Sequence, residues 1–234
     1  MKTTNSLERD IQERFLEILQ NQKENETTNA YKVYQKLVYY RYEEIIRSTF
    51  VQFVKYLSEK ELEDSIYEFL KNPPKTQFVW KMANDYRKFV KKQNIFKDKK
   101  FLYELLYFDW IEVEIFMKEY KEEKDSIFSW NNSYKLASSA RVKEFRFDII
   151  NLNYEDIRQN YLIIYLDFYR EEVLYREINQ FIYVLIKRCK NNSLKSVLKE
   201  LCLENDIDLN EAKSILEEPL KELILNKALF RVFK

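Results

Sequence analysis

The sequence of 234 residues contains neither histidine nor glycine. Histidine is the commonest general base and a common metal ligand, and glycine forms the phosphate loops, dinucleotide-binding turns and nucleophile elbows of many enzymes. Carboxylates, lysine, tyrosine and cysteine remain available for catalysis, but the usual constellations cannot be built without the two missing residue types. We therefore expect that the protein is not an enzyme and that it has no cofactor and no metal site of its own.

Cysteine is also scarce, with only Cys189 and Cys202 in the chain. Two cysteines without histidine do not make a zinc site. Both lie among apolar residues in helical patterns, so buried thiols in a reducing compartment are favoured over a disulfide or a redox pair.

Neither an excess of charge nor a long apolar run is present. Lysine and arginine total 40 against 39 acidic residues, and this balance is unlike that of a strongly electrostatic nucleic-acid binder. The longest clean apolar run, Tyr161–Leu166, is far shorter than a bilayer span. Residues 1–10 are polar and lack the apolar segment of a signal peptide. We expect a cytoplasmic protein that does not bind membranes.

Apolar side chains recur at helical spacing through residues 1–120, which we predict to be an N-terminal bundle of five helices. The first helix contains Leu7, Ile11, Phe15 and Ile18, and the second is long and begins at Tyr31, with its apolar face reaching Phe53. The expected starts and stops of the other helices are a capping box at Ser58 and Glu61, a stop at Pro73-Pro74, and N-caps at Thr76 and Asp98.

Serine, asparagine and charge dominate residues 121–141, which we predict to be a linker before a C-terminal domain of residues 142–234. The expected strands there are an alternating segment at 145–149, then 161–168, 172–177 and 229–233. The expected helices are 180–190, 194–204 after an N-cap at Ser193, and one from Asn210 that Pro219 kinks or restarts. Without glycine, the asparagine pairs 131–132 and 191–192 are expected to take left-handed conformations. The fold class is thus predicted as α+β, predominantly α, with a helical bundle followed by a smaller winged-helix-like domain.

The segment from Lys81 to Lys100 contains eight basic and two acidic residues. Its centre, formed by Arg87, Lys88, Lys91 and Lys92, is a candidate anion-facing patch for nucleic acid or an acidic peptide. In the alternative interpretation, the segment is the solvent-exposed C-terminal end of a helix, where the lysine charges interact favourably with the helix dipole. DNA readout by the C-terminal helix from Asn210 is poorly matched in chemistry, because that helix contains acidic residues where arginine, lysine or amides are expected.

Several short motifs occur in an ordered series: Tyr40-Arg41, Ser48-Thr49-Phe50, Pro73-Pro74, Phe101-Leu102-Tyr103-Glu104-Leu105 and Phe108-Asp109-Trp110. In sequence and spacing they resemble the HvfC/BufC-like family, whose N-terminal domain is often described as DNA-binding. The segments Ile163-Ile164-Tyr165 and Ser193-Leu194 resemble its C-terminal half. The chain departs from the family at Val51, where proline is usual, and at Asp109, where glutamate is usual.

The resemblance implies an accessory protein that binds a multinuclear iron enzyme of the peptide-modifying type and helps present its Cys-containing ribosomal precursor peptide. The iron and the chemistry would belong to the enzyme. Tyr40, Arg41, Glu104 and Trp110 are then candidates for partner binding or domain organisation. In the structural alternative, Trp110 packs the bundle and Arg41 pairs with Glu104. A DNA-binding regulator remains the second functional hypothesis.

Overall fold

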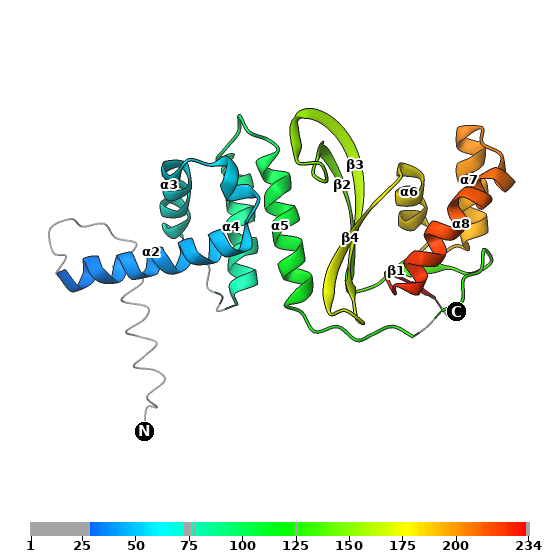
Figure 1. Ribbon diagram of the computed structural model, residues 1–234, viewed down its shortest axis with the longest axis horizontal. Helices are drawn as coiled ribbons and strands as arrows, with labels where there is room; N and C mark the ends of the chain where they lie inside the picture. Colours follow the sequence, from blue (N-terminus) through cyan, green and yellow to red (C-terminus); the bar gives the residue numbers. More distant parts are fainter. Residues whose placement is uncertain (1–28, 73–75, 77, 125, 233–234) are drawn as a thin grey trace, which may run out of the picture. The chain divides into compact units, whose positions relative to one another are not determined.

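A computed structural model of the chain describes residues 29–72, 76, 78–124 and 126–232 (Figure 1). The helices are α2 (Asn29–Thr49), the 3-10 helix η1 (Phe53–Tyr56), α3 (Glu59–Leu70), α4 (Val79–Lys92), α5 (Leu102–Phe116), α6 (Gln180–Arg188), α7 (Leu194–Asn205) and α8 (Leu209–Leu225). The strands are β1 (Tyr134–Leu136), β2 (Ala140–Asp148), β3 (Asn153–Asp167), β4 (Glu172–Ile178) and β5 (Leu229–Arg231). The predicted fold class, α+β and predominantly helical, is confirmed.

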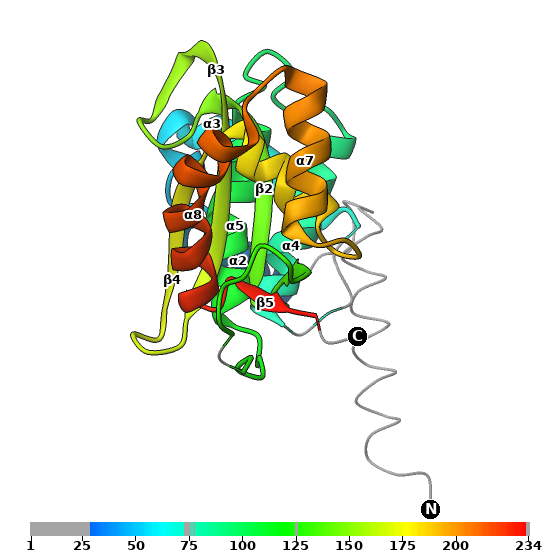
Figure 2. The ribbon, with the colours of Figure 1, turned by 90° about the vertical axis from the view of Figure 1, so that its right-hand side faces the viewer.

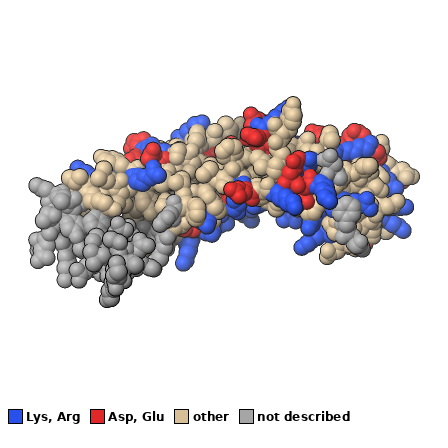
Figure 3. Space-filling model, turned by 90° about the horizontal axis from the view of Figure 1, so that it is seen from below, with Lys and Arg blue, Asp and Glu red and all other residues tan. Residues whose placement is uncertain are grey.

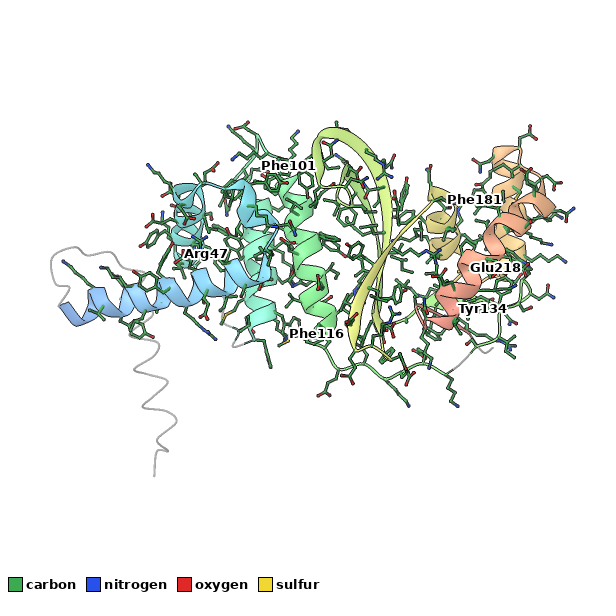
Figure 4. The ribbon with its side chains drawn as sticks, in the orientation of Figure 1. Arg47, Phe101, Phe116, Tyr134, Phe181 and Glu218 are labelled. Atoms are coloured by element: carbon green, nitrogen blue, oxygen red, sulfur yellow. The ribbon has the colours of Figure 1, made fainter. Side chains whose placement is uncertain are left out.

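Contacts within the chain divide it into two compact units, one up to Trp110 and one from Ile111. The division falls inside α5, upstream of the predicted linker at 121–141. That linker segment is partly structured, because it contains β1 and the first residues of β2. Tyr134 of β1 is fully buried, and its hydroxyl donates to the carbonyl of Ile127 at 3.0 Å, so a polar-looking stretch is tied to the second unit (Figure 4).

The core of the first unit is rich in aromatic rings. Phe50, Phe53 and Tyr86 are fully buried, and their ring centroids lie 5.8 to 6.4 Å apart in tilted and edge-to-face pairs. Phe69 joins them with its centroid 5.4 Å from Tyr86. Such pairs stabilise a core beyond the area that they bury. These four aromatic side chains are therefore part of the core of the first unit.

The helix limits in this unit confirm some predictions and overturn others. The capping box of Ser58 and Glu61 is present, with the Glu61 N–H donating to Ser58 Oγ and the Ser58 N–H donating to Glu61. The N-cap of α4 is Phe78 and not Thr76, which instead accepts a hydrogen bond from the Phe78 N–H at 3.3 Å. The prediction at Asp98 was also wrong, since a turn intervenes before α5 begins at Leu102. The helix expected at 7–18 and the Pro73-Pro74 stop lie outside the described residues.

The second unit is built on an antiparallel sheet with the order β2-β3-β4, beside a two-stranded pair of β1 and β5. All three strands of the larger sheet were predicted, but β3 is much longer than expected at fifteen residues. The alternation in β2 breaks near its end, where register shifts beside Phe147 bury Asp148. A bulge adds a residue to one strand and thereby reverses the inward-outward pattern that the sequence suggested.

Helices α6, α7 and α8 cover one face of the larger sheet (Figure 2). Tyr161, Ile163 and Tyr165 of β3 form one buried cluster with side chains of all three helices. Ser193 caps α7 as predicted, and its Oγ accepts from the Ser196 N–H. Pro219 does not restart α8, which is continuous from Leu209 to Leu225.

The prediction for the asparagine pairs was wrong. Among described residues other than glycine, the left-handed positions are Asn94, Phe96, Leu152, Glu171, Asp206 and Lys227. Asp206 is the C-cap of α7, and Lys227 follows α8. A left-handed residue often stands just after the end of a helix, so its place depends on the helix end as well as on the residue type.

Candidate functional site

Tyr40 and Arg41 both lie on the surface of α2. The Tyr40 side chain is 56% exposed, and its ring meets that of Tyr39 edge-on at 5.7 Å. Arg41 pairs with Glu44 at 3.1 Å in an exposed helical pair, and not with Glu104. An exposed pair of this kind contributes little to stability. The two side chains are therefore accessible to a partner.

Trp110 is buried in the first unit, with 7% of its surface exposed. Its indole N–H donates to the carbonyl of Trp80 at 3.1 Å. The guanidinium carbon of Arg87 lies 4.5 Å from the centre of its ring and 5.3 Å from that of Tyr107. Arg87 also donates to Asn84 Oδ1 at 2.8 Å. This geometry gives Trp110 a packing role, the structural alternative considered for it.

Glu104 lies in the first turn of α5, where a carboxylate favours the helix dipole. It is half-buried. Tyr40 and Arg41 thus lie on an exposed helix surface. Glu104 lies at the start of a helix, and Trp110 is buried in the packing of the first unit.

Asp109 has a role that sequence reasoning missed. Its buried carboxylate accepts hydrogen bonds from the backbone N–H groups of Gln52 and Phe53, both at 2.9 Å. It therefore tethers the start of η1 to α5. The available signal was an acidic residue between Phe108 and Trp110, two large aromatic residues of α5.

The basic segment divides into two kinds of side chain. Lys88, Lys91 and Lys92 are exposed, and the structure shows no ion pair for them among the described residues. Arg87 is half-buried against Trp110, so it belongs to the packing of the unit more than to an open patch. Lys99 is also engaged, because its ammonium donates to Glu61 at 2.7 Å. The open charge is therefore smaller than the sequence count, and Figure 3 shows acidic and basic side chains interleaved on the face that it draws.

A more distinctive surface lies in the second unit, and we call it the lysine-rimmed hollow. It has a volume of about 510 Å³. Its lining comes from α6, β1, β2, β5 and nearby loops: Glu123, Lys135, Leu136, Ser138, Val142, Ile186, Lys187, Lys190 and Phe230. The apolar members form a floor, and the lysines are exposed at the rim.

The three lysines of this hollow, Lys135, Lys187 and Lys190, have no ion pair among the described residues. The Lys135 ammonium lies 4.5 Å from the centre of the Phe230 ring, and that of Lys187 lies 5.4 Å from the centre of Tyr183. The one acidic side chain in the lining is Glu123. Cations beside an apolar floor favour a ligand that combines carboxylates with a hydrophobic group.

A second hollow, of about 500 Å³, is polar and lies at the start of α7. The backbone N–H groups there are already occupied: Leu194 donates to the Asn132 carbonyl at 2.9 Å and Lys195 to the Trp130 carbonyl at 2.7 Å. The Ser196 N–H donates to Ser193. Because these donors are taken, this helix start has little capacity left for an anion.

Within the part of the chain that the structure describes, no three histidine, cysteine or acidic side chains lie close enough together to hold a metal ion. Both cysteines are free and buried, as predicted. None of the helices in the described ranges has the length and apolarity needed to cross a membrane.

Comparison with known proteins gives no match, either to a family model or to the sequence of a curated protein. From the structure, a function can therefore be inferred from the geometry of the surfaces described above, without a known relative.

Proposed function

We propose that the protein is a cytoplasmic, non-catalytic accessory subunit that binds a multinuclear iron enzyme and helps present a Cys-containing ribosomal precursor peptide. The ordered motifs from Tyr40-Arg41 to Trp110 support this proposal through their resemblance to the HvfC/BufC-like family. The absence of histidine and glycine from the sequence supports a role that leaves the chemistry to a partner.

The observation on which the peptide-presenting role rests is the lysine-rimmed hollow. Val142 of β2 lines it, and β2 is an edge strand of the sheet order β2-β3-β4. An extended peptide can add to such an edge through main-chain hydrogen bonds while a pocket accepts one of its side chains. Here the pocket is apolar below and cationic at the rim, which favours a peptide segment with a hydrophobic side chain next to acidic residues.

Co-purification tests the first part of the proposal. The full chain is produced together with a candidate multinuclear iron enzyme, and the stoichiometry of the complex is measured by gel filtration with light scattering. A stable complex with a fixed ratio is expected. Two proteins that elute separately at micromolar concentrations would contradict the role as a subunit.

Charge reversal tests the hollow. We expect the double variant Lys187→Glu/Lys190→Glu to weaken binding of the fluorescently labelled precursor peptide at least tenfold, because two rim cations become anions. Lys195→Glu/Lys199→Glu, at exposed positions on α7, makes the same charge change outside the hollow and should bind the peptide within about twofold of the unmodified chain. Equal losses in both variants would mean that overall charge, and not the hollow, determines binding.

The second candidate function is DNA binding by a regulator. It is favoured by Lys88, Lys91 and Lys92, which are exposed and have no ion pair within the part of the chain that the structure describes. A shift of random duplex DNA that weakens steeply with salt would support it, since phosphate contacts release counterions. The variant Lys88→Glu/Lys91→Glu should then abolish the shift. If the unmodified chain gives no shift at low salt, this candidate is rejected.

A further inference from the structure

Strand β2 has an open edge, because it stands first in the sheet order β2-β3-β4. The Leu166 N–H donates to the Ser139 carbonyl at 3.1 Å, so residues 139, 141 and 143 turn their backbone groups toward β3. The backbone groups of residues 140, 142 and 144 therefore point away from the sheet, along its edge. An extended peptide that adds to this edge bonds to these outward groups.

Arg141 occupies the beginning of the edge. Its guanidinium lies 3.3 Å from the Glu114 carboxylate, and its Nη1 donates to the carbonyls of Ser138 and Ala140 at 2.7 and 2.8 Å. The Ala140 N–H is also used, since it donates to the Ala137 carbonyl at 3.0 Å. Both backbone groups of Ala140 therefore already have partners, and an added strand has to begin beyond it.

A bulge ends the open edge on the other side. The register of β2 against β3 shifts after Phe145. A bulge interrupts the ladder and twists an edge strand away from a straight partner. Between the Arg141 contact and this bulge, the residues with outward backbone groups are Val142 and Glu144. Within the described part of the chain, their backbone groups make no hydrogen bond to a segment outside the sheet.

We propose that Arg141 fixes the register of an added peptide strand, which pairs with Val142 and Glu144 alone and places one side chain in the lysine-rimmed hollow. The inference rests on the peptide-presenting role proposed above. Antiparallel pairing is the more stable arrangement, and in it two opposite residues extend their side chains to the same face. Val142 lines the hollow, so the peptide residue opposite Val142 lies over the apolar floor.

The charges along this edge predict the neighbouring residues of the peptide. Glu144 extends to the same face as Val142, and its carboxylate accepts a hydrogen bond from Gln159 at 2.6 Å. A like charge opposite Glu144 is destabilising, so a basic residue is favoured there. Lys135 and Ser138 line the hollow, so its cationic rim lies toward the beginning of β2. In its own direction, an antiparallel peptide therefore has a basic residue, an apolar residue two positions later, and an acidic residue two positions after that.

Two peptides of identical composition test this order. The blocked peptides Lys-Thr-Leu-Thr-Glu and Glu-Thr-Leu-Thr-Lys have the same net charge, so general electrostatic attraction is equal for both. Titration of the full chain, followed by its amide signals in nuclear magnetic resonance, should give the first peptide at least fivefold higher affinity. At saturation, this peptide should slow hydrogen exchange of the Val142 and Glu144 amides at least fivefold and leave that of Lys143, whose amide faces β3, unchanged. Equal affinities, no binding, or protection without this alternation would overturn the proposal.

The variant Arg141→Met tests the positioning role. It removes the donors to the two carbonyls, so the second peptide can shift by two residues and move its glutamate away from Glu144. The ratio of the two affinities should then fall below twofold. Lys143→Met makes the same change of charge on the same face of β2 and should retain the ratio of the unmodified chain. A purely structural role of Arg141 would weaken both peptides equally, and an unchanged ratio would overturn the proposal.

Failure of this inference is distinguishable from failure of the proposed function. If the two peptides bind equally but Lys187→Glu/Lys190→Glu still weakens binding of the precursor peptide, the register is wrong and the presenting role stands. If the chain forms no complex with the iron enzyme while the peptide order and the amide pattern hold, the edge site stands and the subunit role is wrong.

Discussion

The carboxylate of Asp109 accepts a hydrogen bond at 2.9 Å from the backbone N–H of Phe53, which lies 56 positions earlier in the chain. The same oxygen accepts from the Gln52 N–H, so one buried side chain holds the start of η1. This contact fixes the segment between α2 and α3 against α5. Phe53, the residue that it positions, is fully buried among aromatic rings.

We expect Asp109→Ala to lower the free energy of unfolding by about 3 kcal/mol, because it removes a charged acceptor and leaves buried backbone donors without it. Denaturant unfolding followed by circular dichroism measures this change. Asp98→Ala, at an exposed position of the preceding turn, should change stability by less than about 0.5 kcal/mol. A loss at Asp109 as small as that at Asp98 would show that the contact does not hold η1.

Glu61 makes stability depend on pH. Its pKa is lowered to about 2, first by the hydrogen bond from Lys99 and then by that from the Ser58 N–H of the capping box. A folded-state pKa below the unfolded value gives stability that is present above pH 4.5 and is lost as the pH falls toward 2. The Glu61 side chain is 38% exposed, so solvent screening keeps this contribution to about 1 kcal/mol.

The variant Glu61→Gln retains the capping geometry and removes the charge. We expect it to be less stable than the unmodified chain at pH 7 and equally stable near pH 2. Urea unfolding at both pH values measures the difference. Asp64→Asn, on the exposed side of the same helix, should give no comparable convergence. A pH-independent difference for Glu61→Gln would assign the effect to packing and not to charge.

Local signals in the sequence identified several elements of this fold correctly. Ser58 with Glu61 and Ser193 with the start of α7 were predictable because a cap depends on residues within three positions. The three strands of the larger sheet were predictable because alternation or an apolar run extends over several residues of each.

Long-range relationships were not predictable in this way. Strands β1 and β5 have three residues each, and Tyr134 pairs with Arg231 far along the chain, so no local pattern distinguishes β1 from a linker. Asp109 and η1 form another such contact. The lysine-rimmed hollow combines Lys135, Lys187 and Phe230 from three elements, and only the fold brings them together. Of the candidate residues, Trp110 is buried, which agrees with the packing role that was the structural alternative for it.

Ser65 and Tyr86 form a buried hydrogen bond of 2.7 Å between α3 and α4. We expect Tyr86→Phe to lower the free energy of unfolding by about 1.5 kcal/mol, since the buried hydroxyl pair is lost while the ring remains. A double-mutant cycle with Ser65→Ala should show a coupling energy of about 1 kcal/mol. Tyr40→Phe removes an exposed hydroxyl and should change stability by less than about 0.5 kcal/mol. Additive effects of the Tyr86 and Ser65 variants would refute a direct hydrogen bond.

The Cys189 thiol is predicted to be unreactive in the folded protein. Burial raises its pKa to about 11, and its Sγ donates to the Tyr134 carbonyl at 3.1 Å. Burial also raises the pKa of Cys202. Because the thiolate is the reactive form, raising both pKa values keeps both thiols protonated and shielded at pH 8. We expect fewer than about 0.2 thiols per chain to react with a disulfide reagent within an hour under native conditions, and both to react at once in guanidinium.

Rapid reaction of one thiol in the folded chain would reveal local opening around α6 or α7. The variant Cys202→Ser then identifies the site, because a signal that persists in it belongs to Cys189 and the β1 contact, whereas a signal that disappears belongs to α7.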